Sequence, residues 1–330
     1  MAVVRISGGK SFDAAEGEPI LDAALRTGIT FPYSCRNGRC GTCKGRLIEG
    51  SATILQDELG LNLHERSDGW ILTCVRSAGS ALQLDIDDLS DLRLFTAKTL
   101  PCRIHRLDFL GEGVARVFLR LPPAAKFDCY PGQFIDLIGH GGVRRSYSIA
   151  NALLGERLLE LHIQRVAGGT MSNYWFEKAK TGDLLRLHGP LGTFFLRDVQ
   201  GMDLVFLATG TGIAPVKAML EGLVQSDKHK PRSVALYWGV RVREDLYWDV
   251  SIQGLGYDFI PVLSRADSQW CGARGHIQNV FLANAPMLEH AIVYACGSNT
   301  MIQDARETLL GAGLHKRRFF SDAFVPSGSI

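Results

Sequence analysis

The sequence predicts a multidomain chain with a small α+β domain, then an antiparallel barrel, then a doubly wound parallel α/β sheet. Short strand-like runs surround one amphipathic segment in residues 1–92, and alternating strand runs broken by turn residues fill residues 102–200. From residue 201 to 330, apolar strand runs alternate with helical stretches. The second pattern is typical of antiparallel barrels, and the third is typical of parallel sheets covered on both faces. We therefore expect three domains with these boundaries, and a linker at residues 93–101.

The composition is that of an ordinary globular chain and excludes several classes of protein. Of 330 residues, 46% are apolar and 21% are charged, and 36 basic against 34 acidic residues leave a net charge of +2. No long basic run marks a nucleic-acid interface, and no apolar stretch approaches the ~18 residues of a membrane helix. The N-terminus lacks the apolar core of a signal peptide. We therefore expect a cytoplasmic protein that binds neither nucleic acid nor membranes.

The first domain is predicted to hold short strands around one helix. The runs VVRI, KGRLIEG and WILTCV have the composition of strands. In PILDAALRTG the apolar residues recur at helical spacing, with Pro19 before the periodic segment and Gly28 after it. Proline at the start of a helix and glycine after its end are common boundaries, so we expect a helix here.

Three of the eight cysteines are concentrated in one loop of this domain, CRNGRCGTC. Cys35, Cys40 and Cys43 have the spacing C-x4-C-x2-C, and Cys74 follows on an apolar strand run. Together these positions match the plant-type ligand pattern of a [2Fe–2S] cluster.

Two glycines support the cluster interpretation. A loop that wraps so small a cluster needs positive φ angles, which Gly38 and Gly41 can adopt. The alternatives are a four-cysteine zinc site, a redox-active C-x-x-C pair or unliganded thiols. Zinc usually prefers two paired knuckles, and the second knuckle is missing here. Eight cysteines are also too few for a disulfide scaffold in a chain of this length.

The second domain contains the segment RSYS, residues 145–148, at the head of a strand run. The planar guanidinium of an arginine can hold a pyrophosphate, and a tyrosine ring and a serine hydroxyl suit a flavin ring. Alone, the segment is more commonly just a half-exposed strand. Two further features favour a flavin site. GGTMS, residues 168–172, opens a helix whose N–H groups suit phosphate. GPLGTF, residues 189–194, resembles the turn that usually closes the flavin-binding barrel in a known reductase family.

The third domain contains a strand, a glycine turn and a helix in LVFLATGTGIAPVKAML, residues 204–220. Gly210 and Gly212 would let the backbone approach a pyrophosphate at the start of the helix. The pattern is G-x-G-x-x-P rather than G-x-G-x-x-G, so spacing alone leaves the dinucleotide assignment open. CGSNTM, residues 296–301, follows another buried strand run. Cys296 there is either an active-site residue or a small buried hydrophobe.

These motifs resemble those of the ferredoxin–NADP reductase superfamily, in the group that carries an N-terminal plant-type ferredoxin domain. The resemblance implies a β-grasp ferredoxin domain, a six-stranded antiparallel FAD-binding barrel and a doubly wound NAD(P)-binding sheet. It also implies that the irons are ligated by Cys35, Cys40, Cys43 and Cys74, and that the flavin is FAD.

The resemblance further implies which residues contact the organic cofactors. The expected cofactor-binding residues are Arg145, Ser146, Tyr147, Ser148, His162, Gly169, Met171, Ser172, Thr209, Gly210, Thr211, Gly212, Cys296 and Gly297. The expected catalytic residues are Tyr147, Ser148, Cys296 and Phe324. An aromatic residue near the chain end commonly covers the flavin in this superfamily. The alternative for Phe324 is a core residue on a terminal strand.

The residues themselves leave the choice between NADH and NADPH open. After the strand run SVALYWG come Arg241 and Arg243, which suit a 2′-phosphate, and then Glu244 and Asp245, which suit a free 2′-hydroxyl. Both pairs can also be plain solvated charges. NADH is the expected cofactor from the subfamily resemblance, with NADPH as the alternative.

The three predicted cofactors form an electron-transfer chain. NAD(P)H gives up two electrons as a hydride, a [2Fe–2S] cluster accepts one electron at a time, and a flavin can mediate between them. We therefore predict an NAD(P)H-dependent oxidoreductase that passes electrons through FAD and the cluster to a redox partner protein.

The identity of the partner rests on longer stretches of resemblance. LRLPPAAKFDCYPGQFIDLI, RRSYSIAN, YACGS and FFSDAFVPS resemble the CDP-6-deoxy-Δ3,4-glucoseen reductases. These enzymes serve the pyridoxamine-phosphate dehydratase of 3,6-dideoxyhexose synthesis, which is therefore the expected partner of a monomeric or weakly oligomeric chain. The alternatives are the reductase component of a Rieske-type aromatic-ring dioxygenase or a multicomponent monooxygenase, and a non-catalytic redox sensor. Arg36 and Arg39 make the cysteine loop basic and either favour an acidic patch on the partner or are simply solvated.

Overall fold

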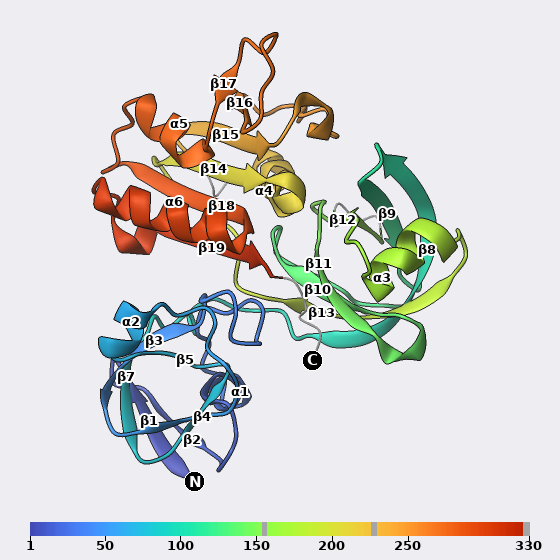
Figure 1. Cartoon of the computed structure of the whole chain (residues 1–330). Helices are drawn as coiled ribbons and strands as arrows, with labels where there is room; N and C mark the ends of the chain where they lie inside the picture. The colour runs from blue at the N-terminus through green and yellow to red at the C-terminus, as the bar shows by residue number, and fades with distance from the viewer. Residues whose placement is uncertain (154–156, 226–229, 326–330) are drawn as a thin grey trace. The chain divides into compact units, whose positions relative to one another are not determined.

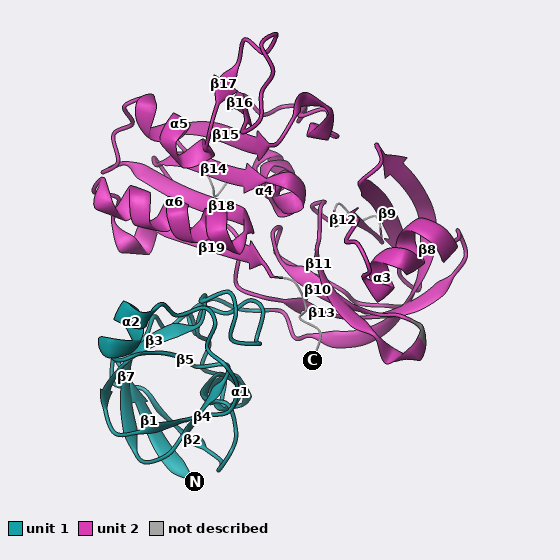
Figure 2. Ribbon diagram, viewed as in Figure 1, with its two compact units in different colours: residues 1–94 teal, residues 95–330 magenta. Residues whose placement is uncertain are grey.

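The computed structural model describes residues 1–153, 157–225 and 230–325, which divide into two compact units at residue 94 (Figures 1 and 2). The predicted linker, residues 93–101, spans this division, and strand β8 begins inside it at Lys98. The last two residues of the segment FFSDAFVPS lie outside the described residues. Within the described part of the chain, no helix is long and apolar enough to cross a membrane.

The first unit is built on a five-stranded sheet with the order β2-β1-β7-β3-β5. Strands β1 and β7 are parallel and the other neighbours are antiparallel. Its elements are β1 (Ala2–Ile6), β2 (Ser11–Ala14), α1 (Ile20–Arg26), β3 (Lys44–Glu49), β4 (Ala52–Ile54), α2 (Leu63–Ser67), β5 (Trp70–Leu72), β6 (Arg76–Ala78) and β7 (Leu82–Asp85). Strands β4 and β6 form a separate antiparallel pair.

Helix α1 confirms the helix predicted from the apolar spacing, and it supplies one wall of the first unit's core. Its buried residues Ile20, Leu21, Ala23 and Ala24 pack in the same apolar cluster as Phe31. The chain leaves the helix through Gly28, whose φ is +83°. The cysteine loop starts soon afterwards, so the packed helix fixes where that loop begins.

The second unit begins with a six-stranded antiparallel sheet in the order β11-β10-β13-β8-β9-β12. Its strands are β8 (Lys98–Leu110), β9 (Val114–Arg120), β10 (Phe134–Ile138), β11 (Arg144–Ser148), β12 (Leu158–Gln164) and β13 (Leu184–Leu191). An isolated bridge between Ile149 and Leu161 joins the chain just after β11 to β12, the two ends of the strand order. Helix α3 (Thr170–Asn173) continues directly into a π-helical turn, Tyr174–Lys178.

The rest of the second unit is a six-stranded parallel sheet in the order β17-β16-β15-β14-β18-β19. Its elements are β14 (Asp203–Thr209), α4 (Ile213–Gln225), β15 (Ser233–Val240), β16 (Asp258–Leu263), β17 (Ala273–Arg274), α5 (Ile277–Ala283), β18 (Ala291–Ser298), α6 (Asn299–Gly311) and β19 (Phe319–Phe324). Short 3₁₀ turns occur at His140–Gly142, Gly210–Gly212, Arg243–Asp245 and Lys316–Arg318.

The central strands of the parallel sheet explain the apolar runs of the sequence. Residues 204–208 of β14 are all buried between β15 and β18, as expected of a strand covered on both faces. In a parallel sheet the carboxyl ends of the strands meet at one edge, where ligands usually bind. Thr209, at the end of β14, and Ser298, at the end of β18, lie at this edge.

Candidate cofactor sites

The four predicted cysteine ligands form two pairs in the first unit. Cys35, Cys40 and Cys43 lie in the loop between α1 and β3, and Cys74 follows β5. A hydrogen bond with Cys40 lowers the pKa of Cys35 to about 7, and one with Cys43 lowers the pKa of Cys74. No group of three or more His, Cys, Asp or Glu among the described residues is arranged to hold a single metal ion. Two pairs, each with one thiol inclined to ionise, suit a cluster in which each of two irons takes two thiolates.

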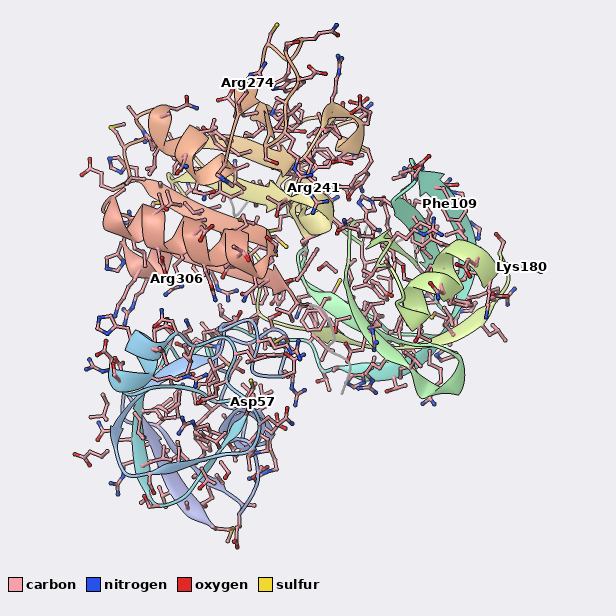
Figure 3. All side chains as sticks on the ribbon, viewed as in Figure 1. Asp57, Phe109, Lys180, Arg241, Arg274 and Arg306 are labelled. Atoms are coloured by element: carbon pink, nitrogen blue, oxygen red, sulfur yellow. The ribbon has the colours of Figure 1, made fainter. Side chains whose placement is uncertain are left out.

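The cysteine loop closes tightly at the two glycines that the sequence singled out. Gly38 and Gly41 have φ angles of +75° and +74°, which confirms the predicted conformation. A Cβ atom at Gly38 would lie 2.3 Å from the carbonyl oxygen of Asp57, which Figure 3 labels. The backbone N–H of Cys40 donates to Cys35 Sγ at 3.3 Å. Such N–H groups, directed at sulfur, stabilise the negative charge that a bound cluster carries.

Strand β11 carries the predicted flavin-site residues of the antiparallel sheet. Because side chains alternate along a strand, Arg145 and Tyr147 lie on one face and Ser146 and Ser148 on the other. The Tyr147 hydroxyl accepts a hydrogen bond from Trp175 Nε1 at 3.1 Å. Burial raises the pKa of Tyr147 to about 12, so this hydroxyl stays protonated and neutral.

The start of α3 brings together three more of the predicted residues. Gly169 caps the helix, and Met171 and Ser172 are buried in its first turn. Ser172 Oγ accepts a hydrogen bond from the backbone N–H of Val166 at 2.8 Å, and a Cβ atom at Gly139 would lie 2.7 Å from the Met171 sulfur. Met171 and Ser172 therefore hold α3 against the strands, and their contact with a flavin stays a prediction.

His162 lies on β12 with both ring nitrogens engaged by protein groups. Its Nε2 is 2.9 Å from Glu160 Oε1, and its Nδ1 is 3.1 Å from the Tyr247 hydroxyl. Burial lowers the pKa of His162, and the hydrogen bond with Glu160 offsets only part of that effect. The neutral ring therefore connects the antiparallel sheet to the segment after β15.

The predicted dinucleotide turn packs against the turn that follows Cys296. A Cβ atom at Gly212 would lie 2.2 Å from the carbonyl oxygen of Cys296, and one at Gly297 would lie 2.0 Å from Thr209 Oγ1. The N–H of Ser298 donates to Thr209 Oγ1 at 3.4 Å. The ends of β14 and β18 thus approach so closely that both turns require glycine at their point of contact.

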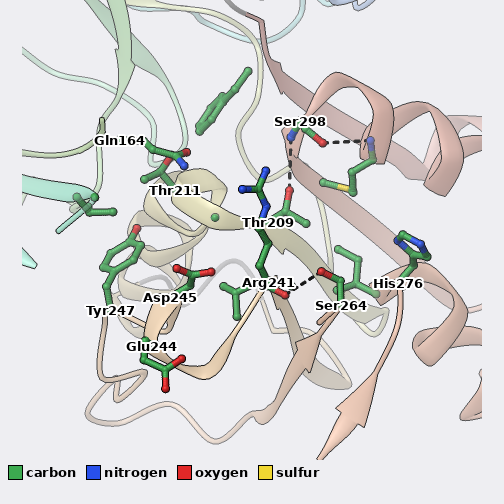
Figure 4. A pocket seen from close by; sticks show the side chains of 18 of the residues that line it. Gln164, Thr209, Thr211, Arg241, Glu244, Asp245, Tyr247, Ser264, His276 and Ser298 are labelled. Carbon is green, nitrogen blue, oxygen red and sulfur yellow. Dashed lines mark hydrogen bonds between the residues drawn. The ribbon is translucent and has the colours of Figure 1, made fainter. Parts of the chain in front are cut away.

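A cavity of about 960 Å³ opens beside these turns, at the carboxyl ends of the parallel strands. Of the predicted residues, Thr209, Gly210, Thr211 and Phe324 line this cavity, and Figure 4 shows the two threonines in its wall. The hairpin tip at residues 110–114 contributes a wall from the antiparallel sheet. Backbone N–H groups at a glycine turn that opens a helix are suited to a pyrophosphate, so this cavity fits a dinucleotide.

The charges around the cavity are mostly negative. Among the described residues that line it, the carboxylates belong to Glu112, Glu244, Asp245 and Asp304, and Arg241 is the one arginine or lysine. Arg241 follows β15 and extends into the cavity in Figure 4. The sequence left open whether this site would bind a 2′-phosphate or a 2′-hydroxyl. In the structure, carboxylates outnumber arginines and lysines among the described lining residues.

Cys296 is fully buried on β18, and the neighbouring strand places Asp322 directly opposite it in register. Burial, with a further contribution from the charge of Asp322, raises the pKa of Cys296 well above its usual value. The thiol is therefore neutral. Phe324 lies two residues further along β19, half-buried, and reaches the cavity.

Sequence reasoning missed several polar residues of this region. Asp322 was not singled out, nor were Glu160, Lys217 and Tyr247, which form a hydrogen-bonded network with His162. One signal was available for Lys217, because it falls among the apolar residues of APVKAML and so on a helix with buried neighbours. A lysine at such a position indicates a buried ion pair.

Three domain families match successive parts of the chain. They are "2Fe-2S iron-sulfur cluster binding domain" over residues 4–78, "Oxidoreductase FAD-binding domain" over residues 101–196 and "Oxidoreductase NAD-binding domain" over residues 206–307. These ranges contain, respectively, the cysteine pairs, strand β11 and the glycine turn.

Similar proteins extend over almost the whole chain. The CDP-6-deoxy-L-threo-D-glycero-4-hexulose-3-dehydrase reductase of Yersinia pestis is 44% identical over 93% of both chains. The xylene/toluene monooxygenase electron transfer component XylA of Pseudomonas putida is 31% identical over 96% of this chain and 91% of its own. The crystal structure of the Amycolatopsis cytochrome P450 reductase GcoB superposes with a TM-score of 0.77 at 29% identity, covering 99% of this chain and all of that one.

Proposed function

The chain belongs to the NAD(P)H-dependent iron–sulfur flavoprotein reductases, and on that basis we propose that its electron acceptor is the pyridoxamine-phosphate dehydratase of 3,6-dideoxyhexose synthesis. Members of this family combine a [2Fe–2S] cluster, FAD and NAD(P)H, and serve as the electron-transfer components of larger enzyme systems. The acceptor, the preference for NADH and the roles of individual residues are the parts that we propose.

One observation carries the choice of acceptor. The relative that is named as a hexulose dehydrase reductase is 44% identical to this chain, whereas the named monooxygenase component is 31% identical. Both similarities extend over more than nine-tenths of the chain, so the difference is not caused by one shared domain. It supports the dehydratase over an oxygenase as the partner.

The proposed roles of the flavin-site residues follow from their positions. FAD accepts a hydride and passes its two electrons on singly. Arg145 and Tyr147 share one face of β11, where the guanidinium would hold the pyrophosphate and the neutral phenol would pack on the ring. Ser148 offers a hydroxyl from the same strand. Cys296 is fully buried and does not line the cavity, so its proposed role is that of a neutral residue at the end of β18, behind the dinucleotide turn.

The proposed preference for NADH rests on the charges of the cavity. In the part of the chain that the structure describes, four carboxylates and one guanidinium line it. A 2′-phosphate would add further negative charge near Glu244 and Asp245, whereas a free ribose 2′-hydroxyl can donate a hydrogen bond to a carboxylate. The balance therefore favours the dinucleotide without the extra phosphate.

Two other functions compete with this proposal. Service to a Rieske-type dioxygenase or a multicomponent monooxygenase is supported by relatives such as the xylene monooxygenase component. A non-catalytic redox sensor would share the fold, but it would not need the dinucleotide turn and its cavity to be intact. Bleaching of the flavin by NADH, followed by reduction of cytochrome c, would exclude the sensor.

The deciding experiment is an anaerobic reconstitution. The purified protein, NADH, a pyridoxamine-phosphate dehydratase and its CDP-4-keto-6-deoxyglucose substrate are mixed, and the 3,6-dideoxy product is quantified. We expect product to form much faster than with an unrelated flavin reductase that reduces cytochrome c at the same rate. Rapid cytochrome c reduction without product would overturn the dehydratase assignment and leave an oxygenase as the acceptor.

A further inference from the structure

The polar network, a set of hydrogen-bonded side chains that are buried or half-buried, connects the antiparallel sheet to the dinucleotide cavity. It consists of Glu160 and His162 on β12, Lys217 and Glu221 on α4, and Tyr247 in the segment after β15. Glu160, His162 and Lys217 are 5%, 6% and 8% exposed, so their contacts are largely removed from water. Polar groups buried in this way are costly unless each is satisfied.

The hydrogen-bond donors and acceptors of the polar network determine the protonation of His162. Glu160 is ionised, because the hydrogen bond with His162 and the charge of Lys217 outweigh the effect of burial and lower its pKa. A carboxylate only accepts hydrogen bonds, so His162 Nε2 must carry the proton that it donates. The Nδ1 of the neutral ring is then an acceptor, and the Tyr247 hydroxyl donates to it at 3.1 Å.

Lys217 connects the polar network to helix α4, on which it lies. Its Nζ contacts Glu160 Oε2 at 2.8 Å, Glu221 Oε1 at 2.6 Å and the carbonyl oxygen of Ala150 at 3.1 Å. Glu221 in turn accepts a hydrogen bond from the backbone N–H of Ala152 at 2.9 Å. Helix α4, which begins directly after the dinucleotide turn, is therefore fastened to the antiparallel sheet and to the segment after β11.

Tyr247 connects the polar network to the dinucleotide turn at Gly210 by a second route. Its ring packs edge-on against Trp238 at 5.3 Å, and Trp238 Nε1 donates to the carbonyl oxygen of Gly210 at 3.0 Å. Tyr247 also lines the cavity, where Figure 4 shows it beside Asp245. The turn at Gly210 is thus held through α4 and through Trp238, and both connections lead back to β12.

We infer that Glu160, His162, Lys217 and Tyr247 are positioning residues, which set the dinucleotide turn at a fixed place relative to the flavin-binding sheet. Hydride transfer requires the two rings to meet in register, whereas dinucleotide binding depends mainly on the parallel sheet. Loosening the polar network is therefore expected to slow hydride transfer more than it weakens the binding of the dinucleotide. This inference rests on the NAD(P)H reductase activity of the family and not on the identity of the electron acceptor.

Two conservative variants test the inference in the holoenzyme without any partner protein. Tyr247→Phe removes only the hydroxyl that reaches His162, and Glu160→Gln removes the charge between His162 and Lys217 while keeping the shape. The matched control is Tyr257→Phe. It removes a hydroxyl that donates to the Val250 carbonyl at 3.0 Å and is not part of the polar network. Stopped-flow reduction by NADH yields the limiting rate and the dissociation constant separately.

We expect both variants to lower the limiting rate of flavin reduction by about tenfold, since a displacement of about 1 Å can cost 10²-fold in rate. The dissociation constant of NADH should change less than about twofold, because misplacement of the rings affects the reaction step, whereas dinucleotide binding depends mainly on the parallel sheet. Hydrogen–deuterium exchange should rise in residues 213–225 and 158–164. The control should leave all three readouts at their wild-type values.

Two results would overturn the inference. If the limiting rate is unchanged while only thermal stability falls, the polar network is merely structural. If the dissociation constant rises and the limiting rate does not fall, Tyr247 is a binding residue rather than a positioning residue. Because NADH and FAD alone are involved, neither result depends on the dehydratase assignment.

Discussion

Two acidic residues after β15 are the ones that we propose to select between the ribose 2′-hydroxyl of NADH and the 2′-phosphate of NADPH. Glu244 and Asp245 line the dinucleotide cavity together with Arg241. Asp245 also caps its own turn, since one of its carboxylate oxygens accepts a hydrogen bond from the Val242 N–H at 3.3 Å. An amide in place of each carboxylate would keep the local shape and remove the negative charge.

The double variant Glu244→Gln, Asp245→Asn is therefore expected to use NADPH better. Removing two like charges near a phosphate is worth on the order of 1 kcal/mol, or about fivefold to tenfold in kcat/KM. The ratio of kcat/KM for NADPH to that for NADH, measured by cytochrome c reduction, checks this. Glu307→Gln, on α6 and outside the cavity lining, serves as the control. An unchanged ratio in the double variant would mean that these carboxylates do not face the ribose.

At the scale of the structural elements, the two turns at the ends of β14 and β18 constrain each other. Gly212 does not need a positive φ; it needs the absence of a side chain, because the Cys296 carbonyl would lie 2.2 Å from its Cβ. All three atoms nearest to a new methyl group are backbone atoms, of Cys296 and Gly297, so none of them can rotate away. Relief would require one turn to move.

We expect Gly212→Ala to destabilise the protein by about 1–3 kcal/mol, the usual cost of overpacking. It should also weaken dinucleotide binding, because the displaced turn lines the cavity. Thermal unfolding and titration of the flavin spectrum with NAD⁺ measure the two effects. Gly311→Ala is the matched control, since Gly311 ends α6 with no atom within 4 Å of an added Cβ. The argument fails if the two variants behave alike.

The outcome at this scale shows which features the sequence could predict. Local patterns carried the helix before the cysteine loop, the positive φ at Gly38 and Gly41, and the strand–turn–helix at 204–220, because each depends on neighbours in the chain. The Lys217–Glu160 contact spans 57 positions and the Tyr247–His162 contact spans 85. Pairs of this kind follow from the packing of two sheets, and no local periodicity reports them.

The predicted linker shows a second limit. Residues 98–101 belong to β8 because they pair with β13, from Lys98 with Gly189 to Pro101 with Arg186. Their polar and proline-containing sequence gives no strand signal by itself. Tertiary pairing overrides local preference here.

At the scale of the whole molecule, each of the two compact units carries its own chemistry. All four candidate cluster ligands lie within residues 1–94, and the candidate flavin and dinucleotide residues lie within residues 95–330. The first unit has its own apolar core, which includes Phe31, Leu72 and Leu84. Loss of the cluster should therefore leave flavin binding intact.

Cys40→Ser tests this independence. We expect the variant to lose the iron–sulfur absorption and the transfer of electrons to cytochrome c while it retains stoichiometric FAD. Reduction of the flavin by NADH should continue at the wild-type rate, because neither the turn at Gly210 nor strand β11 is touched. Cys271→Ser, which changes an exposed cysteine of the second unit, is the control. Loss of FAD from Cys40→Ser would show that the two units depend on each other.

The same separation has a meaning for the history of such chains. A segment that brings its own core and all four candidate cluster ligands in under a hundred contiguous residues can be moved by one recombination event. If the electron acceptor docks on the first unit, as we propose, donor and acceptor specificities can diverge independently, because the proposed docking surface is encoded apart from the residues that line the dinucleotide cavity. Exchanging this cassette between relatives is accordingly the most direct way to redirect the electrons to a new enzyme.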